Sequence, residues 1–241
     1  MSEHAGTVES HYEIGHEHAD ITGGWLRPAV FGAMDGLVSN FALIAGVAGG
    51  GVSSRVIVLA GLAGLAAGAF SMAAGEYTSV AAQAESAEAE IAKEREELRT
   101  NPFGEEAELA AAYVARGVSP EIAREWARQL HRDPEHALRV HTREELGVTA
   151  DDLPSPKLAS VASFLSFAIG AFVPLMPYLL GATVLWPSVV LALLGLFACG
   201  AVVTRVTSRP WWFGGTRQLI LGALAAALTY GIGSLVGVGL G

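Results

Sequence analysis

Carboxylates gather in the middle of the chain at spacings that suit cation binding. Nine glutamates fall within residues 84–109, and Glu76 lies just before them. On a helix, residues three or four positions apart lie on one face. Several converging anionic oxygens are what a hard divalent cation requires. The glutamates with this spacing are Glu90, Glu94 and Glu97 in one group and Glu105 and Glu108 in another.

Basic residues interleaved with these glutamates leave a second interpretation open. Lys93, Arg95 and Arg99 alternate with the carboxylates, as on an ordinary solvated helix face held by ion pairs. We favour that interpretation for the glutamates outside the best-spaced groups, namely Glu85, Glu88 and Glu96.

A second set of candidate ligands lies in apolar sequence. Asp35 interrupts one apolar block, and a carboxylate in a membrane span is a functional hypothesis by default. In another block Met72 and Glu76 are four residues apart and share a helix face. Counting along each helix from its predicted end places Asp35 and Met72 roughly 10–12 Å from the same membrane face. A carboxylate and a thioether could therefore meet at one depth, with Glu76 nearer the entrance. The alternatives are a structural hydrogen bond for Asp35 and simple packing for Met72.

Apolar blocks determine the expected architecture. The chain is 51% hydrophobic with a mean hydropathy of +0.41, although it carries 24 acidic residues. Five blocks are each near the ~20 residues that span a bilayer, so we expect an all-α polytopic membrane protein with five transmembrane helices. The blocks are Leu26–Gly50, Val56–Val80, Leu158–Leu180, Ala182–Thr204 and Leu219–Leu240.

A small helical domain is expected between the second and third spans. The second span continues as a polar helix to Thr100, where Asn101-Pro102 ends it. Turn and cap signals predict further helices at 104–116, 120–131 (with Ser119 as N-cap) and 134–146. The predicted domains are thus a tail at 1–24, spans one and two at 25–80, the helical domain at 81–156 and spans three to five at 157–241. The expected core residues of the domain are Leu98, Leu109, Ala112, Tyr113, Ile122, Trp126, Leu130, Leu138 and Leu146.

Charge and cysteine content exclude several classes of protein. Residues 81–156 hold 17 acidic and nine basic side chains, and residues 1–24 hold five acidic and none basic, so nucleic acid is not an expected partner.

The N-terminus lacks a signal-peptide pattern, and the first span is expected to act as its own insertion signal. Cys199 stands alone inside a span and is expected to pack there. The tail contains His4, His11, His16 and His18; we expect it to be disordered, with weak metal binding as the alternative.

Basic residues in the short loops predict the orientation. Arg205, Arg209 and Arg217 flank the loop between spans four and five, and Arg55 is the one basic residue in a loop of the opposite side. By the positive-inside rule, the N-terminus and the acidic domain face the cytosol and the C-terminus faces outside.

Two membrane motifs and the acidic helices together resemble the vacuolar iron transporter family. The segments that carry the resemblance are Asp35-Gly-Leu-Val-Ser-Asn40 with Ala45-Gly-Val47, Ser71-Met-Ala-Ala-Gly-Glu-Tyr-Thr-Ser79, the glutamates from Glu94 to Glu108, and Glu144-Glu-Leu-Gly147. The resemblance covers nearly all of residues 26–241. It implies a homodimer of five-span subunits that exchanges Fe²⁺, and often Mn²⁺, for protons, with a cytosolic metal-binding domain.

The resemblance also assigns roles to residues. It implies transport-path ligands at Asp35 and Met72, and domain ligands at the pairs Glu94/Glu97 and Glu105/Glu108 and at Glu145. One departure stands out: His141 and Thr142 occupy the place of a pair of methionines in the family. His141 could replace a methionine as a borderline ligand for Fe²⁺.

The expected function is therefore export of Fe²⁺, with Mn²⁺, Co²⁺ or Zn²⁺ as further candidate ions, across a bacterial plasma membrane in exchange for protons. The ions are cargo, and no prosthetic group is expected. The alternative is a membrane-anchored protein that buffers or senses metal with its acidic domain. An enzyme is not expected, since the sequence shows no Glu-x-x-His besides Glu13 and His16 of the tail, no nucleophile paired with a base and no phosphate-binding loop.

Overall fold

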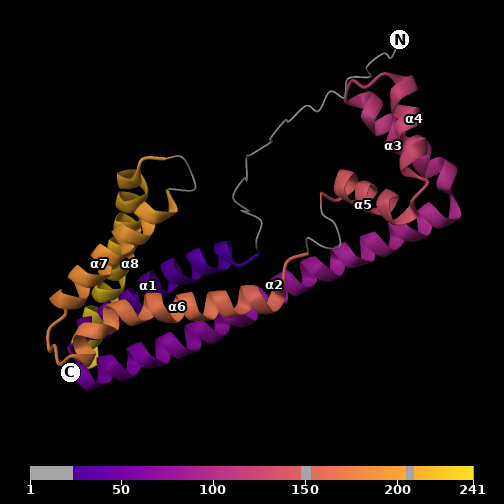
Figure 1. The fold of residues 1–241 in the computed structure, drawn as a ribbon. Coiled ribbons are helices and arrows are strands. Elements are labelled where there is room, and N and C mark those ends of the chain that lie inside the picture. Colours follow the sequence, from indigo (N-terminus) through magenta and orange to yellow (C-terminus); the bar gives the residue numbers. More distant parts are fainter. Residues whose placement is uncertain (1–23, 148–152, 205–208, 241) are drawn as a thin grey trace, which may run out of the picture.

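The computed structural model describes residues 24–147, 153–204 and 209–240, and every regular element in these ranges is a helix (Figure 1). The histidine-containing tail, Asp151 and Asp152 of the linker, and Arg205 lie outside the described residues. The helices are α1 (Leu26–Gly49), α2 (Ser54–Thr100), α3 (Pro102–Ala115), α4 (Pro120–Leu130), α5 (Pro134–Glu145), α6 (Pro156–Leu179), α7 (Trp186–Val203) and α8 (Trp211–Leu240).

Five of these helices are long and apolar enough to cross a membrane, namely α1, α2, α6, α7 and α8. The prediction of an all-helical protein with five spans is confirmed by this count over the described ranges. Tryptophans begin α7 and α8, at Trp186 and Trp211. An indole at the end of a span is typical of the membrane–water interface.

Helix α2 is too long to lie within a bilayer. Its 47 residues correspond to about 70 Å, against a hydrocarbon core of about 30 Å. The apolar residues occupy its first half and the charged residues its second half, so the second half extends out of the membrane. The helix is continuous to Thr100, as predicted, and Asn101 then caps α3 by accepting a hydrogen bond from the Gly104 N–H.

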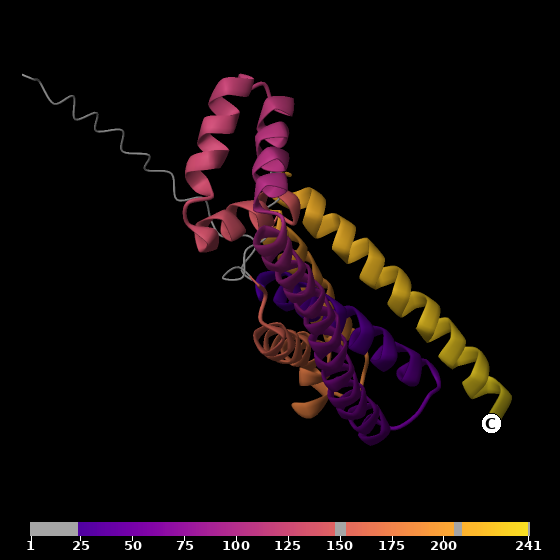
Figure 2. The same ribbon diagram turned by 90° about the vertical axis from the view of Figure 1, so that its right-hand side faces the viewer.

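The spans pack through small residues. Helix α6 lies against α1 and α2, while α8 lies against α1 and α7 (Figures 1 and 2). At Gly36 a Cβ atom would collide with the backbone of Phe167, and at Gly170 it would collide with the backbone of Ala33. These two glycines therefore allow α1 and α6 to touch through their backbones. The Ser160 hydroxyl adds a hydrogen bond from α6 to the Ala73 carbonyl of α2, at 2.9 Å.

The helical unit at the far end of α2 is built on alanines. Helices α3 and α4 form a pair that projects beyond the spans (Figure 2). Their shared core consists of Leu109, Ala110, Ala123, Ala127 and Leu130. Helix α5 returns along α2, which brings the end of the unit back toward the acidic face of that helix (Figure 1).

Three predicted core residues of this unit were wrong. Ile122 is 64% exposed, and Trp126 and Leu146 are each 37% exposed. Small alanines let α3 and α4 approach closely, so the buried face of α4 runs through Ala123 and Ala127 and leaves Ile122 outside. Trp126 packs on the Tyr113 ring with 4.4 Å between centroids, as an anchor. Ser119 occupies the N-cap position of α4, but its side chain makes no capping hydrogen bond.

Candidate metal-binding sites

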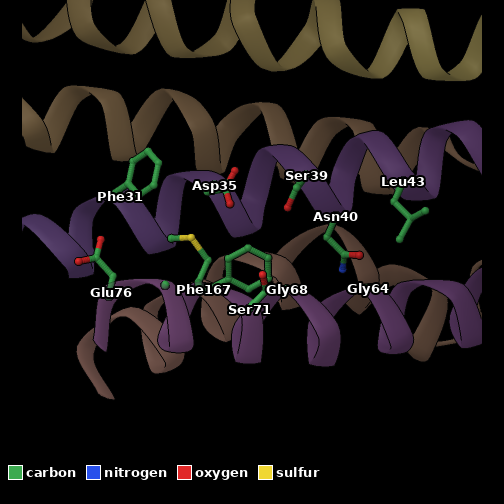
Figure 3. Close-up of a pocket in the computed structure, with 12 residues that line it drawn as sticks. Phe31, Asp35, Ser39, Asn40, Leu43, Gly64, Gly68, Ser71, Glu76 and Phe167 are labelled. Carbon is green, nitrogen blue, oxygen red and sulfur yellow. The ribbon is translucent and has the colours of Figure 1, made fainter. Parts of the chain in front are cut away.

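A cavity of about 470 Å³ lies between α1 and α2, and the three membrane residues singled out by the sequence line it. Asp35 of α1 and Glu76 of α2 lie on the two sides of the cavity (Figure 3). Met72 also comes from α2. All three are half-buried. Phe167 of α6 closes the cavity between the two helices. The structure therefore brings these three side chains together, and their role as ligands stays a prediction.

The polar groups follow one another along the cavity. Because α1 and α2 run in opposite directions, Glu76 lies at one end, Asp35 follows, and Ser39, Ser71 and Asn40 come next (Figure 3). Met72 is one helical turn from Glu76 in α2, on the side toward Ser71. Outside the tail and residues 81–156, Asp35 and Glu76 are the two acidic residues of the chain. Negative charge in the membrane half is thus confined to this cavity.

Glycines of α2 make room for the cavity. Gly64 and Gly68 line it, facing Asn40 and Phe167 respectively (Figure 3). A Cβ atom at Gly68 would collide with the Phe167 ring. The small residues thus allow the helices to pack closely and also leave space between α1 and α2.

A second cluster joins three helices outside the spans. Glu94 of α2, Glu105 of α3 and His141 of α5 are all buried, and each offers a ligand atom within 4.8 Å of the others. Nδ1 of His141 lies 3.0 Å from Oε1 of Glu94 and 4.0 Å from Oε2 of Glu105. The same nitrogen lies 3.4 Å from Oε1 of Glu145, which is half-exposed. One imidazole therefore faces three carboxylates.

The remaining predicted ligands surround this cluster. Glu97 and Glu108 lie close enough to Glu94 for their charges to raise its pKa. Glu97 is also paired with Lys93 at 3.8 Å, and both side chains are largely exposed. Thr142 is buried, but its hydroxyl donates to the Leu138 carbonyl at 2.9 Å.

Solvated ion pairs account for several other glutamates. Glu96 is held by Arg99 at 2.6 Å on the exposed face of α2, and Arg95 reaches Glu135 at 3.6 Å. For Glu96 the geometry agrees with the solvated-face interpretation.

Burial and crowding change the protonation of the cluster. Burial, followed by the charges of Glu145, Glu105, Glu97 and Glu108, raises the pKa of Glu94 to about 7. Burial also raises the pKa of Glu105, and it lowers the pKa of His141. The imidazole of His141 is therefore neutral near pH ~7, and one of its nitrogens carries a lone pair that can bind a metal.

His131 was not a candidate from the sequence. Its contact with His141 bears on which nitrogen of His141 carries the lone pair. Nδ1 of His131 lies 2.8 Å from the Ala127 carbonyl, which can only accept, so this nitrogen carries a proton. In the neutral ring the other nitrogen, Nε2, is then an acceptor, and Nε2 of His141 lies 3.3 Å from it. That arrangement places the proton of His141 on Nε2 and its lone pair on Nδ1, facing Glu94.

The pair formed by His141 Nδ1 and Glu94 Oε1 lacks a hydrogen-bond partner among the described residues. Two lone pairs 3.0 Å apart repel each other unless a proton or a cation lies between them. Imidazole nitrogen with carboxylate oxygen is a donor set suited to Fe²⁺, Zn²⁺ or Mn²⁺. No local sequence signal marks His131, because its contact with His141 depends on the turn between α4 and α5.

Fold and sites together define a class: a polytopic helical membrane protein with one set of candidate ligands between its first two spans and a second set on a helical unit outside them. Comparison with known proteins then gives the family. A family model described as "VIT family" matches residues 26–234, and the chain belongs to this family.

Curated relatives resemble the chain over most of its length. It is 33% identical to Vacuolar iron transporter 1 of Oryza sativa subsp. japonica over 96% of this chain and 94% of the relative. It is 39% identical to the Vacuolar iron transporter of Acanthamoeba castellanii over 89% of this chain and 79% of the relative. It is 31% identical to Vacuolar iron transporter 1 of Arabidopsis thaliana over 92% of this chain and 90% of the relative.

Proposed function

We propose that this protein transports Fe²⁺, and also Mn²⁺, out of the cytosol in exchange for protons. The observation that carries the proposal is the cavity in which Asp35, Met72 and Glu76 meet between two membrane-spanning helices. A carboxylate in a span is costly unless it serves an ion or a partner. Membership of the VIT family, whose relatives above are named iron transporters, supports the same function.

In the proposed route, ions collect on the cluster around Glu94 and then enter the cavity past Glu76. Asp35 and Met72 bind the ion through a carboxylate and a thioether, a donor pair that suits Fe²⁺. A proton and a divalent ion compete for the same carboxylate oxygens, so protonation of Asp35 favours release. This competition couples outward movement of metal to inward movement of protons.

Orientation and assembly are part of the proposal. Arg209, just before α8, and Arg217, near the start of α8, support a cytosolic location for that end of the bundle and so for the helical unit. We further propose that two copies associate over the open side of the cavity, where Phe31 and Leu43 are exposed.

The buried cluster of Glu94, Glu105 and His141 also favours a second function, in which the spans only anchor a metal buffer or sensor. Purified protein in liposomes distinguishes the two. Transport predicts Fe²⁺ flux that depends on a pH gradient and is lost in Asp35→Asn. If Asp35→Asn exchanged Fe²⁺ for protons at the parental rate, the proposed mechanism would be wrong; absence of flux in the parent would favour the anchor.

A further inference from the structure

Asn40 lines the cavity further from Glu76 than Asp35 does. Asn40 is five residues after Asp35, about 7.5 Å further along α1. Its side chain is only 2% exposed and lies beside the cavity between α1 and α2 (Figure 3). A buried amide in a membrane span normally has both its ends hydrogen-bonded.

One end of this amide is fixed. Nδ2 of Asn40 donates to the Ala171 carbonyl of α6 at 2.6 Å. The carbonyl oxygen can only accept, so the amide cannot be reversed without setting two oxygens against each other. The bond to α6 therefore holds the orientation of Asn40 and directs Oδ1 away from α6.

The other end has no protein partner. Oδ1 of Asn40 is buried and accepts no hydrogen bond from any residue in the part of the chain that the structure describes. Across from it is Gly64 of α2, where even a Cβ atom would come within 3.0 Å of Oδ1. Any side chain at position 64 would occupy the space in front of this oxygen. The glycine keeps this space free of a side chain from α2.

We propose that Asn40 Oδ1 is a second binding station for the transported ion, beyond Asp35. This inference rests on the proposed transport of divalent metal and adds an inner step to it. The hydroxyls of Ser39 and Ser71 line the same stretch of the cavity (Figure 3). Carbonyl and hydroxyl oxygens are hard, neutral donors that suit Mn²⁺ and Fe²⁺.

A neutral station after a charged one has a physical use in transport. An ion must be bound firmly enough to enter and weakly enough to leave. Asp35 supplies a charge, whereas Asn40 replaces part of the hydration shell without one. The ion can thus leave Asp35 toward Asn40 when a proton takes its place, and it is not trapped at the second station.

The test compares two replacements of Asn40 in full-length protein in liposomes, with Fe²⁺ kept reduced and with Mn²⁺. Asn40→Leu keeps the volume but removes the oxygen, and it should raise KM by about tenfold for both ions, the effect of losing one ligand contact. Asn40→Asp keeps an oxygen and adds a charge. It should lower KM and also lower kcat, because the ion then leaves slowly.

Ser163→Ala is the control, since Ser163 has a buried, unpartnered hydroxyl on α6 but does not line the cavity. If Asn40→Leu has the same KM as Ser163→Ala, the proposal is overturned. Asn40→Asp with the same defect as Asn40→Leu would also overturn it, because both lose the bond to Ala171 and only that bond would then matter. If Asn40→Leu does not fold, Asn40→Asp still decides: unchanged KM and kcat contradict the station. Asp35→Asn, measured in parallel, reports separately on the proposed transport mechanism.

Discussion

His141 Nδ1 and Glu94 Oε1 lie 3.0 Å apart at the junction of α5 and α2, with both side chains buried. His131 fixes the lone pair of His141 toward Glu94 through the 3.3 Å contact between the two Nε2 atoms. This contact has room for either a proton or a cation between the two atoms, and occupation by one would exclude the other. This exclusion makes the helical unit sensitive to pH.

We expect Glu94→Gln to stabilise the metal-free protein at high pH. The pKa of Glu94 is about 7 in the folded state, above its ordinary 4.5, so the folded state binds the proton more tightly than the unfolded state does. Stability from this residue is therefore full below about pH 4.5 and is lost as the pH rises through about 7.

The gain in Glu94→Gln should be at most about 3 kcal/mol above pH ~7, and it should fall toward zero near pH ~4.5. Thermal unfolding of full-length protein in detergent with a chelator measures it. Glu96→Gln, which breaks an exposed ion pair, is the control. Equal effects of Glu94→Gln at both ends of the pH range would contradict the buried-carboxylate explanation.

Metal binding to the cluster should weaken as the pH falls. Going from about pH 8 to about pH 6, the ionised fraction of a carboxylate with a pKa near 7 falls by about tenfold, and the apparent affinity for Mn²⁺ should follow. Calorimetry on the double variant Asp35→Asn with Glu76→Gln, which removes both carboxylates of the membrane cavity, isolates this effect. An affinity independent of pH would mean that Glu94 is not a ligand.

His131→Phe should weaken metal binding without removing a predicted ligand. The substitution keeps an aromatic ring but removes the acceptor that holds the proton of His141 on Nε2. Loss of such an outer partner typically costs 10–100-fold in affinity, so we expect about tenfold here. His136→Phe, an exposed histidine of α5, is the matched control. If both variants bind metal with the same affinity, His131 only packs against its neighbours and does not support a ligand.

Much of the fold could be predicted from the sequence because its signals are local. Five apolar blocks, the cap at Asn101 and the change from apolar to charged residues along α2 each depend on neighbouring residues. The depth of Asp35 and Met72 followed from the rise of a helix, and both line one cavity.

Other features depend on contacts between distant segments and gave no such signal. Ile122 fits an apolar helical pattern, yet the alanines of α4 decide which face is buried. The contact of His131 with His141 requires the turn between α4 and α5. The sequence gives no sign that Oδ1 of Asn40 lacks a partner among the described residues. That property depends on the hydrogen bond from Nδ2, at the other end of the amide, to the Ala171 carbonyl.

Met72→Leu should change the choice of ion more than the rate. Leucine fills a similar volume, so the contact with Phe167 and its neighbours in α6 is kept while the sulfur is lost. Soft donors favour Fe²⁺ and Co²⁺ over Mn²⁺. We expect the ratio of Fe²⁺ to Mn²⁺ transport to fall by about threefold to tenfold, as for loss of one weak ligand. Met176→Leu in α6, away from the cavity, is the control; an equal ratio in both variants would make Met72 a packing residue.

Filling the cavity from α2 should separate transport from metal capture. In Gly64→Val the new side chain would enter the space before Asn40 and Leu43, whereas Gly231→Val on α8 has nothing within 4 Å to meet. We expect the first variant to lose at least about tenfold in Fe²⁺ flux, because a branched side chain fills the space between α2 and these two residues. It should still bind Mn²⁺ at the cluster of Glu94, Glu105 and His141, which lies outside the spans. The second variant should transport normally. Normal flux through Gly64→Val would show that ions do not pass between α1 and α2. Loss of both flux and binding would show that the protein had misfolded. Loss of flux with binding intact is the result that agrees with a path through this cavity.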